Sequence, residues 1–479
     1  MADIEWLIEQ IDEAPEGPHI GAFFDFDGTV IAGYSALAFF KYRLRRREIS
    51  PNEVVRTVAE SLSIERRGKD VDELMHYGVR GQAGRSVDEV ESWARDVFAR
   101  NIAETIYPDA RELVDAHVRK GHTVVIASSA TRPQIQATAD DLGINVLLCT
   151  EMEVGEDDRY TGRLSSPIRW GQAKADAVRD LAASLDIDLD ASFGYSNGPE
   201  DVPFLSEVGC PVALNPDDEL EQEARTRGWP AARLTTPPET KPLDLARTGL
   251  ALGVFGAAVA TSGVLGVLNR SRSWGADLAA TAGSNLTLAT AGVRLRVVGE
   301  ENAFSARPAV FTFNHQSQLD VFVLGALLQR DFSGVAKKSL ERDPFFGPVG
   351  YLTQVVYIDR ADSAKARTGL ESAVEALENG KSIAIAPEGT RSPTPRLLPF
   401  KKGPFHLAMQ AGVPMVPVVM RNCGEIMAAH SMVIHPGVVD VAVLPPIDTS
   451  AWTRENLNEQ VSTVRQMYLD TLADWPAAD

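Results

Sequence analysis

The feature that most constrains the fold of this chain is a run of 21 residues without a charged side chain, Thr248 to Leu268, near its middle. As an α-helix this run would be about 31 Å long at ~1.5 Å per residue, close to the thickness of a bilayer's hydrocarbon core. A second uncharged run of 16 residues, from Leu278 to Val293, follows a short polar break. Such segments must be buried in protein or in lipid, so they divide the chain into two halves.

The two uncharged runs together predict a hydrophobic, membrane-associated helical hairpin over residues 245–296. The second run is too short for a comfortable span. The break between the runs carries Arg270, Arg272 and Trp274, which suit the headgroup region. We therefore expect the hairpin to rest in one leaflet, with a transmembrane span as the less favoured arrangement. The alternative is a buried helix pair packed through small residues, for which the Gly-x-x-x-Gly spacing at residues 249–253 is typical.

Short apolar runs alternate with helical patterns in both halves, as in parallel α/β domains. Upstream of the hairpin, HIGAFFDFDG, HTVVIASSA and ASFGYSN are predicted strands, and charged helical sequence between the first two predicts an inserted cap. Downstream, runs such as AVFTFNH, SIAIAPEGT and MVPVVMR are again predicted strands. A proline-rich stretch between the halves is typical of a linker. The predicted domains are a Rossmann-like parallel sheet at 1–228 with a helical cap at about 33–110, a linker at 229–244, the hairpin at 245–296, a second α/β domain at 297–450 and a C-terminal helix at 451–479.

Two acids one residue apart, Asp25 and Asp27, directly follow the first predicted strand in FFDFDGTV. At the carboxyl end of a parallel strand one carboxylate can attack a substrate while the other moves a proton. Gly28 and Thr29 allow a tight turn and offer backbone N–H groups to a phosphate. An acidic turn that caps a helix would explain one of the two acids but not the whole context. The pattern therefore indicates a site that handles phosphate.

This pattern resembles the haloacid dehalogenase superfamily, and within it the subgroup that includes phosphoserine phosphatases, over residues 18–225. The resemblance implies that Asp25 is the nucleophile that forms an aspartyl-phosphate and that Asp27 is the general acid and base. It also implies that Ser128, at the end of VVIAS, and Lys174, in GQAKADAV, bind the phosphoryl group. Taken singly, Ser128 is more typical of a helix cap and Lys174 of a solvated helix residue.

Mg²⁺ is the cofactor that the resemblance implies, held by Asp25, Asp27, Asn197 and Asp201, the last two in YSNGPEDVPFL. At the position of Asn197 the family usually carries an aspartate. An amide oxygen can ligate Mg²⁺ but lacks the charge, so we expect weaker metal binding and slower turnover. Two alternatives stay open for this domain: an active phosphatase of unknown substrate, or a non-catalytic regulatory module.

His315 and Asp320 stand at the end of another predicted strand, in FTFNHQSQLD. On an ideal helix residues five apart point about 140° apart, so the two can meet only if His315 precedes the helix. Asp320 could then fix the imidazole tautomer and leave the other nitrogen to take a proton from an alcohol. By itself the pair also fits a structural histidine followed by a capping box from Ser317 to Asp320.

Support for a catalytic pair comes from further polar residues that follow predicted strands. A turn that combines an acid with a guanidinium can orient a hydroxyl and bind an anion. The candidate substrate-binding residues are Glu388, Gly389, Thr390 and Arg391 in AIAPEGTRS, Arg360 in VVYIDR and Lys337 in GVAKK.

In this order the pieces resemble the lysophosphatidate acyltransferase family over about residues 245–450. The HX4D motif falls on His315 and Asp320, and the motif EGTRS and a strand around Pro417 follow the arginine motif at Arg360. The resemblance implies acyl transfer from acyl-CoA or acyl carrier protein to the sn-2 hydroxyl of 1-acylglycerol-3-phosphate. The product is phosphatidate for phospholipid biosynthesis, and no cofactor is implied beyond the donor. Gln354 stands where the arginine motif commonly carries glycine, which leaves the acceptor headgroup open.

Charge and cysteine usage bound the partners and the compartment. A net charge of -19 argues against nucleic acid as the main partner, because phosphate binding normally needs a basic excess. Three scattered cysteines indicate reduced thiols, and the N-terminal sequence has no signal pattern. We expect the cytoplasmic face of the cell membrane, with membrane phospholipid and lysophosphatidate as partners. The alternative is a phosphatase of soluble substrates that the second half tethers to the membrane.

Overall fold

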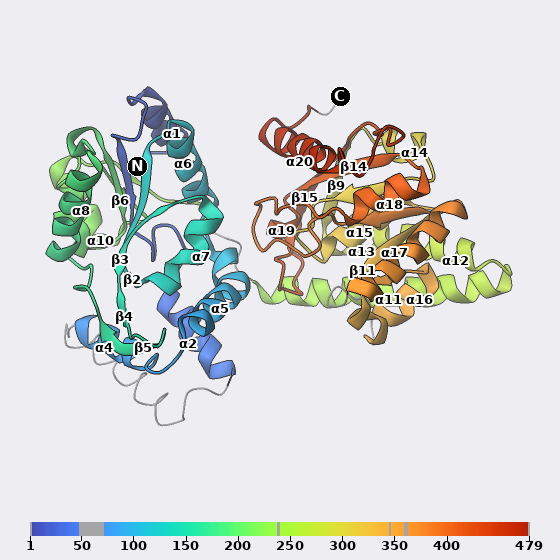
Figure 1. The fold of residues 1–479 in the computed structure, drawn as a ribbon, viewed down its shortest axis with the longest axis horizontal. Coiled ribbons are helices and arrows are strands. Elements are labelled where there is room, and N and C mark those ends of the chain that lie inside the picture. The colour runs from blue at the N-terminus through green and yellow to red at the C-terminus, as the bar shows by residue number, and fades with distance from the viewer. Residues whose placement is uncertain (1, 47–70, 237–239, 344–345, 359–362, 478–479) are drawn as a thin grey trace. The chain divides into compact units, whose positions relative to one another are not determined.

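The computed structural model describes residues 2–46, 71–236, 240–343, 346–358 and 363–477. The chain forms two compact units, Met1–Pro237 and Pro238–Asp479. Each unit has its own sheet with helices on both faces (Figure 1). The predicted α/β fold class is therefore confirmed for both halves.

The sheet of the first unit has six parallel strands in the order β3-β2-β1-β6-β7-β8. Neighbouring side chains of β1 enter different cores: Phe24 packs with α1, α6 and α7, and Phe23 packs with α8 and α10. Because the strands are parallel, the residues that follow β1 and β6 lie at one edge of the sheet. The strands are β1 (Gly21–Phe24), β2 (Thr123–Thr131), β3 (Val146–Thr150), β6 (Phe193–Ser196), β7 (Cys210–Leu214) and β8 (Ala231–Ala232). The helices are α1 (Ile4–Glu13), α6 (Pro108–Arg119), α7 (Arg132–Leu142), α8 (Gln172–Leu185) and α10 (Asp218–Arg227).

A helical cap is inserted between β1 and β2. Its described helices are α2 (Ser35–Arg45), α4 (Val71–Arg80) and α5 (Val87–Val97). A small antiparallel pair, β4 (Met152–Val154) and β5 (Tyr160–Leu164), follows β3 and packs against α4. The predicted cap therefore has an added β element that the sequence pattern did not indicate.

The predicted linker at 229–244 differs from what the structure shows. Ala231 and Ala232 form β8 at the edge of the first sheet, where they pair with β7, and Leu234 is buried. The helix α11 already begins at Pro242. A two-residue edge strand has no apolar periodicity, so proline content alone extended the predicted linker into the sheet.

The sheet of the second unit has seven strands in the order β12-β11-β13-β10-β14-β15-β9. Only β14 and β15 pair antiparallel among its described strands. One face packs on α11, α13 and α15, and the other on α17, α18 and α20. The strands are β9 (Val293–Val298), β10 (Val310–Phe313), β11 (Phe332–Lys337), β12 (Val356–Ile358), β13 (Ser382–Ile385), β14 (Met415–Arg421) and β15 (Gly437–Val443). The helices are α11 (Pro242–Leu268), α13 (Ser284–Ala291), α15 (Leu319–Leu328), α17 (Ser363–Glu378), α18 (Gly403–Ala411) and α20 (Leu457–Ala473).

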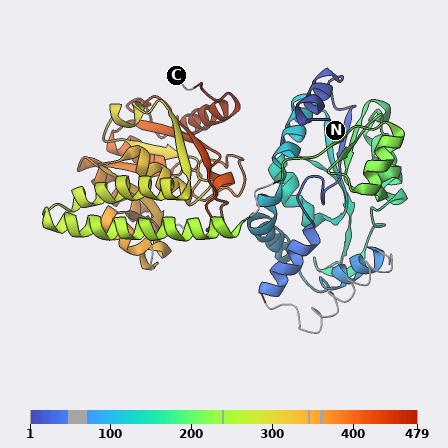
Figure 2. The ribbon, with the colours of Figure 1, turned by 180° about the vertical axis from the view of Figure 1, so that it is seen from behind.

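The predicted helical hairpin is present. The chain turns after α11, and α12 (Arg272–Leu278), a π-helical turn and α13 run back alongside it (Figure 2). The helices approach most closely at two glycines, where a Cβ on Gly275 would lie 3.0 Å from Cα of Gly266. Gly249 and Gly253 have open space where their side chains would be, so the small-residue contact uses other glycines than the predicted pair.

Two histidines and a tyrosine form a buried hydrogen-bond network in the first unit. His122 Nε2 lies 2.8 Å from the Pro15 carbonyl oxygen, His117 Nδ1 lies 2.8 Å from His122 Nδ1, and His117 Nε2 lies 2.8 Å from the Tyr195 hydroxyl. A carbonyl only accepts, so Nε2 of His122 carries the proton and its Nδ1 accepts from His117. Tyr195 then donates to His117, and every group is satisfied only while both imidazoles are neutral.

We predict that the hydrogen-bond network of His117, His122 and Tyr195 lowers the stability of the first unit in acid, against the opposite contribution of Asp25 and Asp27, whose pKa values burial raises. Burial lowers the pKa of His117 well below its ordinary value of 6.5, so the unfolded chain binds a proton that the folded chain excludes. The stability contribution is complete above pH 6.5 and falls by about 1.4 kcal/mol per pH unit below it. The difference between the wild type and His117→Asn in amide hydrogen exchange of β1 and β6, followed from pH 8 to pH 5, isolates the His117 contribution. Exposed His19 serves as the control, and a slope lost in His19→Gln would contradict the assignment to His117.

Candidate active sites

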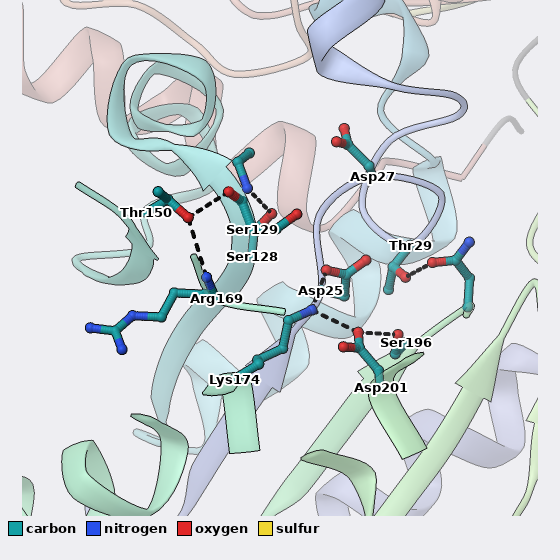
Figure 3. Close-up of polar contacts among 12 residues, drawn as sticks. Asp25, Asp27, Thr29, Ser128, Ser129, Thr150, Arg169, Lys174, Ser196 and Asp201 are labelled. Atoms are coloured by element: carbon teal, nitrogen blue, oxygen red, sulfur yellow. Dashed lines mark hydrogen bonds and ion pairs between the residues drawn. The ribbon is translucent and has the colours of Figure 1, made fainter. Parts of the chain in front are cut away.

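Lys174 lies at the centre of a polar site in the first unit (Figure 3). Its side chain is 2% exposed, and Nζ donates to Asp25 Oδ1 at 2.8 Å and to Asp201 Oδ2 at 2.7 Å. Burial alone would lower the pKa of Lys174, but the two carboxylates raise it above its ordinary value. The ammonium is therefore a fixed cation beside Asp25, and the solvated position typical of a lone helix lysine does not apply.

The two acids that contact Lys174 come from the ends of neighbouring strands. Asp25 follows β1, and its N–H donates to the Tyr195 carbonyl of β6. Burial raises the pKa of Asp25 to about 6, although Lys174 opposes the shift. Asp201 accepts a hydrogen bond from Ser196 Oγ at 2.6 Å, and its Oδ1 is buried without a hydrogen-bond partner in the described structure. An orphaned carboxylate oxygen of this kind is the position where a cation is expected.

Asp27 faces the cap. Its carboxylate accepts from the Ser35 N–H at 2.7 Å and from the Ser35 Oγ at 3.1 Å, at the first turn of α2. Figure 3 shows Asp27 apart from the group around Lys174. Burial raises the pKa of Asp27 to about 7, so this carboxyl group can hold a proton near neutral pH.

The expected Mg²⁺ ligands come together in part. Asn197 Oδ1 accepts from Thr29 Oγ1 at 3.1 Å, and its amide lies against Gly28, which has a φ of +83° and no room for a side chain. No group of three or more His, Cys, Asp or Glu residues in the described ranges could hold a metal ion. Asp25 and Asp201 nevertheless meet at Lys174, and the unpartnered Asp201 oxygen and the Asn197 amide oxygen are of the donor types that suit Mg²⁺.

Ser128 lies at the end of β2 and is buried, where its Oγ accepts from the Ala130 N–H at 3.1 Å. Figure 3 places it beside Ser129, across from Asp25. The sequence pattern did not single out two residues that orient the acids, Ser35 and Ser196. A serine at a helix start or after a strand is too common a signal to identify either of them.

His315 and Asp320 form a hydrogen-bonded pair in the second unit. His315 follows β10, and Asp320 lies in the first turn of α15, so the chain turns between them as predicted. His315 Nδ1 lies 2.7 Å from Asp320 Oδ2. The Asp320 side chain is fully buried, whereas that of His315 is 23% exposed. A carboxylate only accepts when ionised, so Nδ1 carries the proton and Nε2 keeps its lone pair.

The Asp320 carboxylate also orders the turn that carries His315. The same Oδ2 accepts from the Gln316 N–H at 2.9 Å and from the Ser317 N–H at 3.0 Å. The helix itself begins after Gln318 without a side-chain cap, so the predicted capping box is not formed. The Asp320 carboxylate instead orders the turn before the helix and orients the imidazole.

Glu388 accepts hydrogen bonds from two backbone N–H groups, one of them that of His315. Its Oε1 accepts from the His315 N–H at 2.7 Å, and its Oε2 accepts from the Leu398 N–H at 2.8 Å. The side chain is buried, which raises the pKa of Glu388 to about 7. Ser392 N–H also donates to the His315 carbonyl at 2.7 Å. Glu388 therefore positions the turn that carries His315, whereas the sequence analysis placed it among the substrate-binding residues.

The remaining predicted binding residues of the second unit differ in their surroundings. Arg391 Nη1 donates to the Ala429 carbonyl at 2.6 Å, and burial lowers the pKa of Arg391. Gly389 has a φ of +74° and packs against Lys401, while Thr390 is exposed. Lys337 is exposed at the end of β11. Arg360 lies outside the described residues.

The backbone conformation at Gln354 explains why a glycine suits this position. Its φ is +58°, in the left-handed region that a Cβ disfavours. Its carbonyl accepts from Ser333 Oγ at 2.6 Å, and its side chain accepts from Lys381 Nζ. The departure from the family pattern therefore concerns backbone conformation at the start of β12.

We predict that Glu388→Ala destabilises the second unit. The change orphans two backbone N–H groups, at roughly 1–3 kcal/mol each when the groups stay buried. Glu388→Gln keeps one acceptor oxygen and should show the smaller loss. Urea unfolding, monitored by hydrogen exchange of β10, measures the stability. Equal stability of Glu388→Ala and the wild type would contradict this stabilising role of Glu388.

Both halves match models of known families. Residues 22–206 match the haloacid dehalogenase-like hydrolase model, and residues 294–421 match the acyltransferase model. Among relatives of the first half, the chain is 33% identical over 265 residues to the "Inhibition of morphological differentiation protein" of Streptomyces azureus, covering 53% of this chain and 95% of that protein. It is 34% identical to phosphoserine phosphatase SerB1 of Mycobacterium tuberculosis, covering 50% of this chain and 78% of that protein.

The second half is similar to acyltransferases in sequence and in structure. It is 38% identical over 186 residues to 1-acyl-sn-glycerol-3-phosphate acyltransferase of Saccharomyces cerevisiae, covering 38% of this chain and 61% of that enzyme. The acyltransferase PlsC of Thermotoga maritima aligns in structure with a TM-score of 0.41 and 23% identity, covering 49% of this chain and all of that one. Through its first unit the chain belongs to the haloacid dehalogenase-like hydrolases, and its second unit contains the region that matches the acyltransferase model.

Proposed function

We propose that this chain is a membrane-associated acyltransferase fused to a Mg²⁺-dependent phosphatase. The second unit transfers a fatty acyl group from acyl-CoA or acyl carrier protein to the sn-2 hydroxyl of 1-acylglycerol-3-phosphate, and the product is phosphatidate. The observation that carries this proposal is the His315–Asp320 pair, with Nδ1 bound to a buried carboxylate and Nε2 free at a partly exposed ring.

The acyl transfer follows from this geometry. His315 Nε2 takes the proton of the acceptor hydroxyl as its oxygen attacks the thioester carbonyl carbon. The bond from that carbon to sulfur breaks, and the thiolate takes the proton from the imidazolium. Asp320 stabilises the imidazolium charge and keeps the ring in one tautomer. Basic side chains near the site, such as Lys401, would attract the anionic headgroup.

An acyl-transfer assay tests the proposal. Purified protein in vesicles is given lysophosphatidate or another lysophospholipid, with acyl-CoA or acyl carrier protein as the donor. We expect transfer to lysophosphatidate with at least one donor. Absence of transfer to every lysolipid with both donors would refute the acyltransferase assignment.

For the first unit we propose hydrolysis of a phosphomonoester. Asp25 attacks phosphorus, the ester oxygen leaves with a proton from Asp27, and water then releases phosphate from the aspartyl-phosphate. Lys174 holds Asp25 in place and offsets the transferred charge. Asp25, Asn197 and Asp201 would hold Mg²⁺, which neutralises phosphate charge when bound. The alternative, a regulatory module, is favoured if no phosphate ester is hydrolysed in Mg²⁺.

The membrane contact is proposed for the hairpin, on the cytoplasmic side. Within the described residues α11 is the one helix long and apolar enough to cross a membrane, and only 22% of its most apolar window is buried. Val267 and Leu268 are 78% and 74% exposed beside the turn that carries Trp274. An acceptor lipid whose tails remain in the bilayer requires an active site near the interface.

We predict that Val267→Asp with Leu268→Asp releases the protein from liposomes. Each aspartate would place a charge in the apolar layer, where burial is strongly unfavourable. Flotation of the full chain with anionic vesicles measures the effect. Val118→Asp, at a residue that is 49% exposed in the first unit, is the matched control. Unchanged flotation of the double variant would refute this contact. Deletion of α11 is not a suitable test, because Phe255 of α11 packs on α15 and its loss would disturb the fold.

A further inference from the structure

The cap helix α2 presents an apolar face to solvent. Its inner side is packed: Phe39 contacts the core and Tyr42 is buried. On the opposite side Leu37 and Leu44, seven residues apart, are 49% and 43% exposed. Tyr34, which precedes the helix, is 70% exposed. The spacing places the two leucines on one stripe, so the outer face of α2 resembles that of an interfacial helix.

The same helix is basic in an acidic protein. Residues 35–46 contain four basic residues and no acid, whereas the whole chain carries a net charge of -19. Lys41 and Arg45 are exposed between and beside the two leucines. Basic residues interleaved with exposed apolar ones are complementary to an anionic lipid surface, where charge and acyl region are reached together. This combination favours a bilayer over nucleic acid or an acidic protein, neither of which offers the apolar layer.

The first residue of α2 contacts Asp27, the proposed proton donor of the first unit. The Ser35 N–H and hydroxyl, at its first residue, both donate to the Asp27 carboxylate. A lipid surface in contact with the outer face of α2 would therefore be linked to the proton donor, Asp27, through this one helix. The second unit, if held at a bilayer, also keeps the first unit at a high local concentration of lipid because both belong to one chain.

We propose that the outer face of α2, formed by Tyr34, Leu37, Lys41, Leu44 and Arg45, docks on an anionic lipid bilayer. The substrate of the first unit is then a lipid phosphomonoester. This inference rests on the proposed phosphatase activity and names its substrate class. With phosphatidate, water and the lipid give diacylglycerol and inorganic phosphate: the bond from phosphorus to the glycerol oxygen breaks, and that oxygen takes a proton from Asp27. Phosphatidate, the proposed product of the second unit, contains the bond from phosphorus to the glycerol oxygen that the first unit would cleave.

The experiment compares three substrates of the full chain in Mg²⁺ without acyl donor. They are dioleoyl phosphatidate in phosphatidylglycerol vesicles, dihexanoyl phosphatidate as monomers, and p-nitrophenyl phosphate. The test variant is Leu37→Asp with Leu44→Asp, and the matched control is Val118→Asp with Leu185→Asp, at residues that are 49% and 45% exposed away from α2. We expect the test variant to lose at least about tenfold in hydrolysis of vesicle phosphatidate. Hydrolysis of both monomeric substrates should stay unchanged.

The outcomes separate the inference from the function beneath it. Hydrolysis of p-nitrophenyl phosphate without hydrolysis of either phosphatidate overturns the lipid substrate and leaves the phosphatase. Hydrolysis of none of the three by the wild type overturns both. Equal losses on vesicles and on monomers in the test variant overturn the docking surface, because α2 would then act on the cap itself. A second variant, Lys41→Glu with Arg45→Glu, should lose vesicle hydrolysis most at low salt.

Discussion

Replacing His315 with alanine is expected to lower the rate of acyl transfer to 1-acylglycerol-3-phosphate by about 10²–10⁴-fold, the usual contribution of a positioned general base. Asp320 accepts a hydrogen bond from Nδ1 of this imidazole, which fixes the tautomer. The other ring nitrogen, Nε2, is then able to accept a proton. Without it the acceptor hydroxyl must lose its proton to water. Initial rates with saturating donor, over a range of lysophosphatidate concentrations, separate this effect on kcat from an effect on KM.

The matched control for His315 is His406→Ala, at a half-buried histidine of α18 in the same unit. It should keep wild-type transfer. Both variants should hydrolyse phosphate esters as the wild type does, since Asp25 and Lys174 lie in the other unit. Acyl transfer that persists in His315→Ala would remove the base assignment and, with it, the proposed mechanism.

The second large effect is expected from Asp25→Asn, which should lower phosphate ester hydrolysis by on the order of 10³-fold or more, as loss of a nucleophile does. The amide keeps the shape of the side chain but cannot form the aspartyl-phosphate. It also leaves the ammonium of Lys174 with one carboxylate partner, Asp201. Release of inorganic phosphate in the presence of Mg²⁺ measures the loss, and acyl transfer should not change.

A variant on the same helix as Lys174 controls for this loss. Asp176→Asn removes an exposed acid that contacts Arg179 and should leave hydrolysis unaffected. Trapping of phosphate on the protein adds a direct readout, since only a chain with Asp25 can carry the acyl phosphate. A wild-type chain that hydrolyses no phosphate ester in Mg²⁺ would instead support the regulatory module.

Local sequence was sufficient for the elements that lead into both sites. Apolar runs that end in acids, an asparagine or a histidine predicted β1, β6 and β10, and the residues after them lie at the carboxyl ends of parallel strands. The uncharged runs predicted the hairpin. The strands β4, β5 and β8 were missed because their sequences, MEV, YTGRL and AA, contain too few strongly apolar residues to distinguish them from loops.

The roles of polar side chains were less accessible. Glu388 was expected to face a substrate, yet both of its oxygens accept backbone N–H groups. The contact of the Asp27 carboxylate with Ser35, at the first turn of the cap helix α2, was not predicted. A motif indicates that an acid is required, but the partner of that acid is set by which loop folds over it.

The sequence by itself determined the two α/β units, the apolar hairpin between them and the order of the motifs, because periodicity and turn chemistry act over neighbouring residues. Only the tertiary structure decided which groups meet across the chain. Lys174 reaches an acid 149 residues away, and Glu388 holds a backbone group 73 residues away. Such contacts depend on sheet order and on burial, which lowers the local dielectric and makes an unpaired charge too costly to leave without a partner.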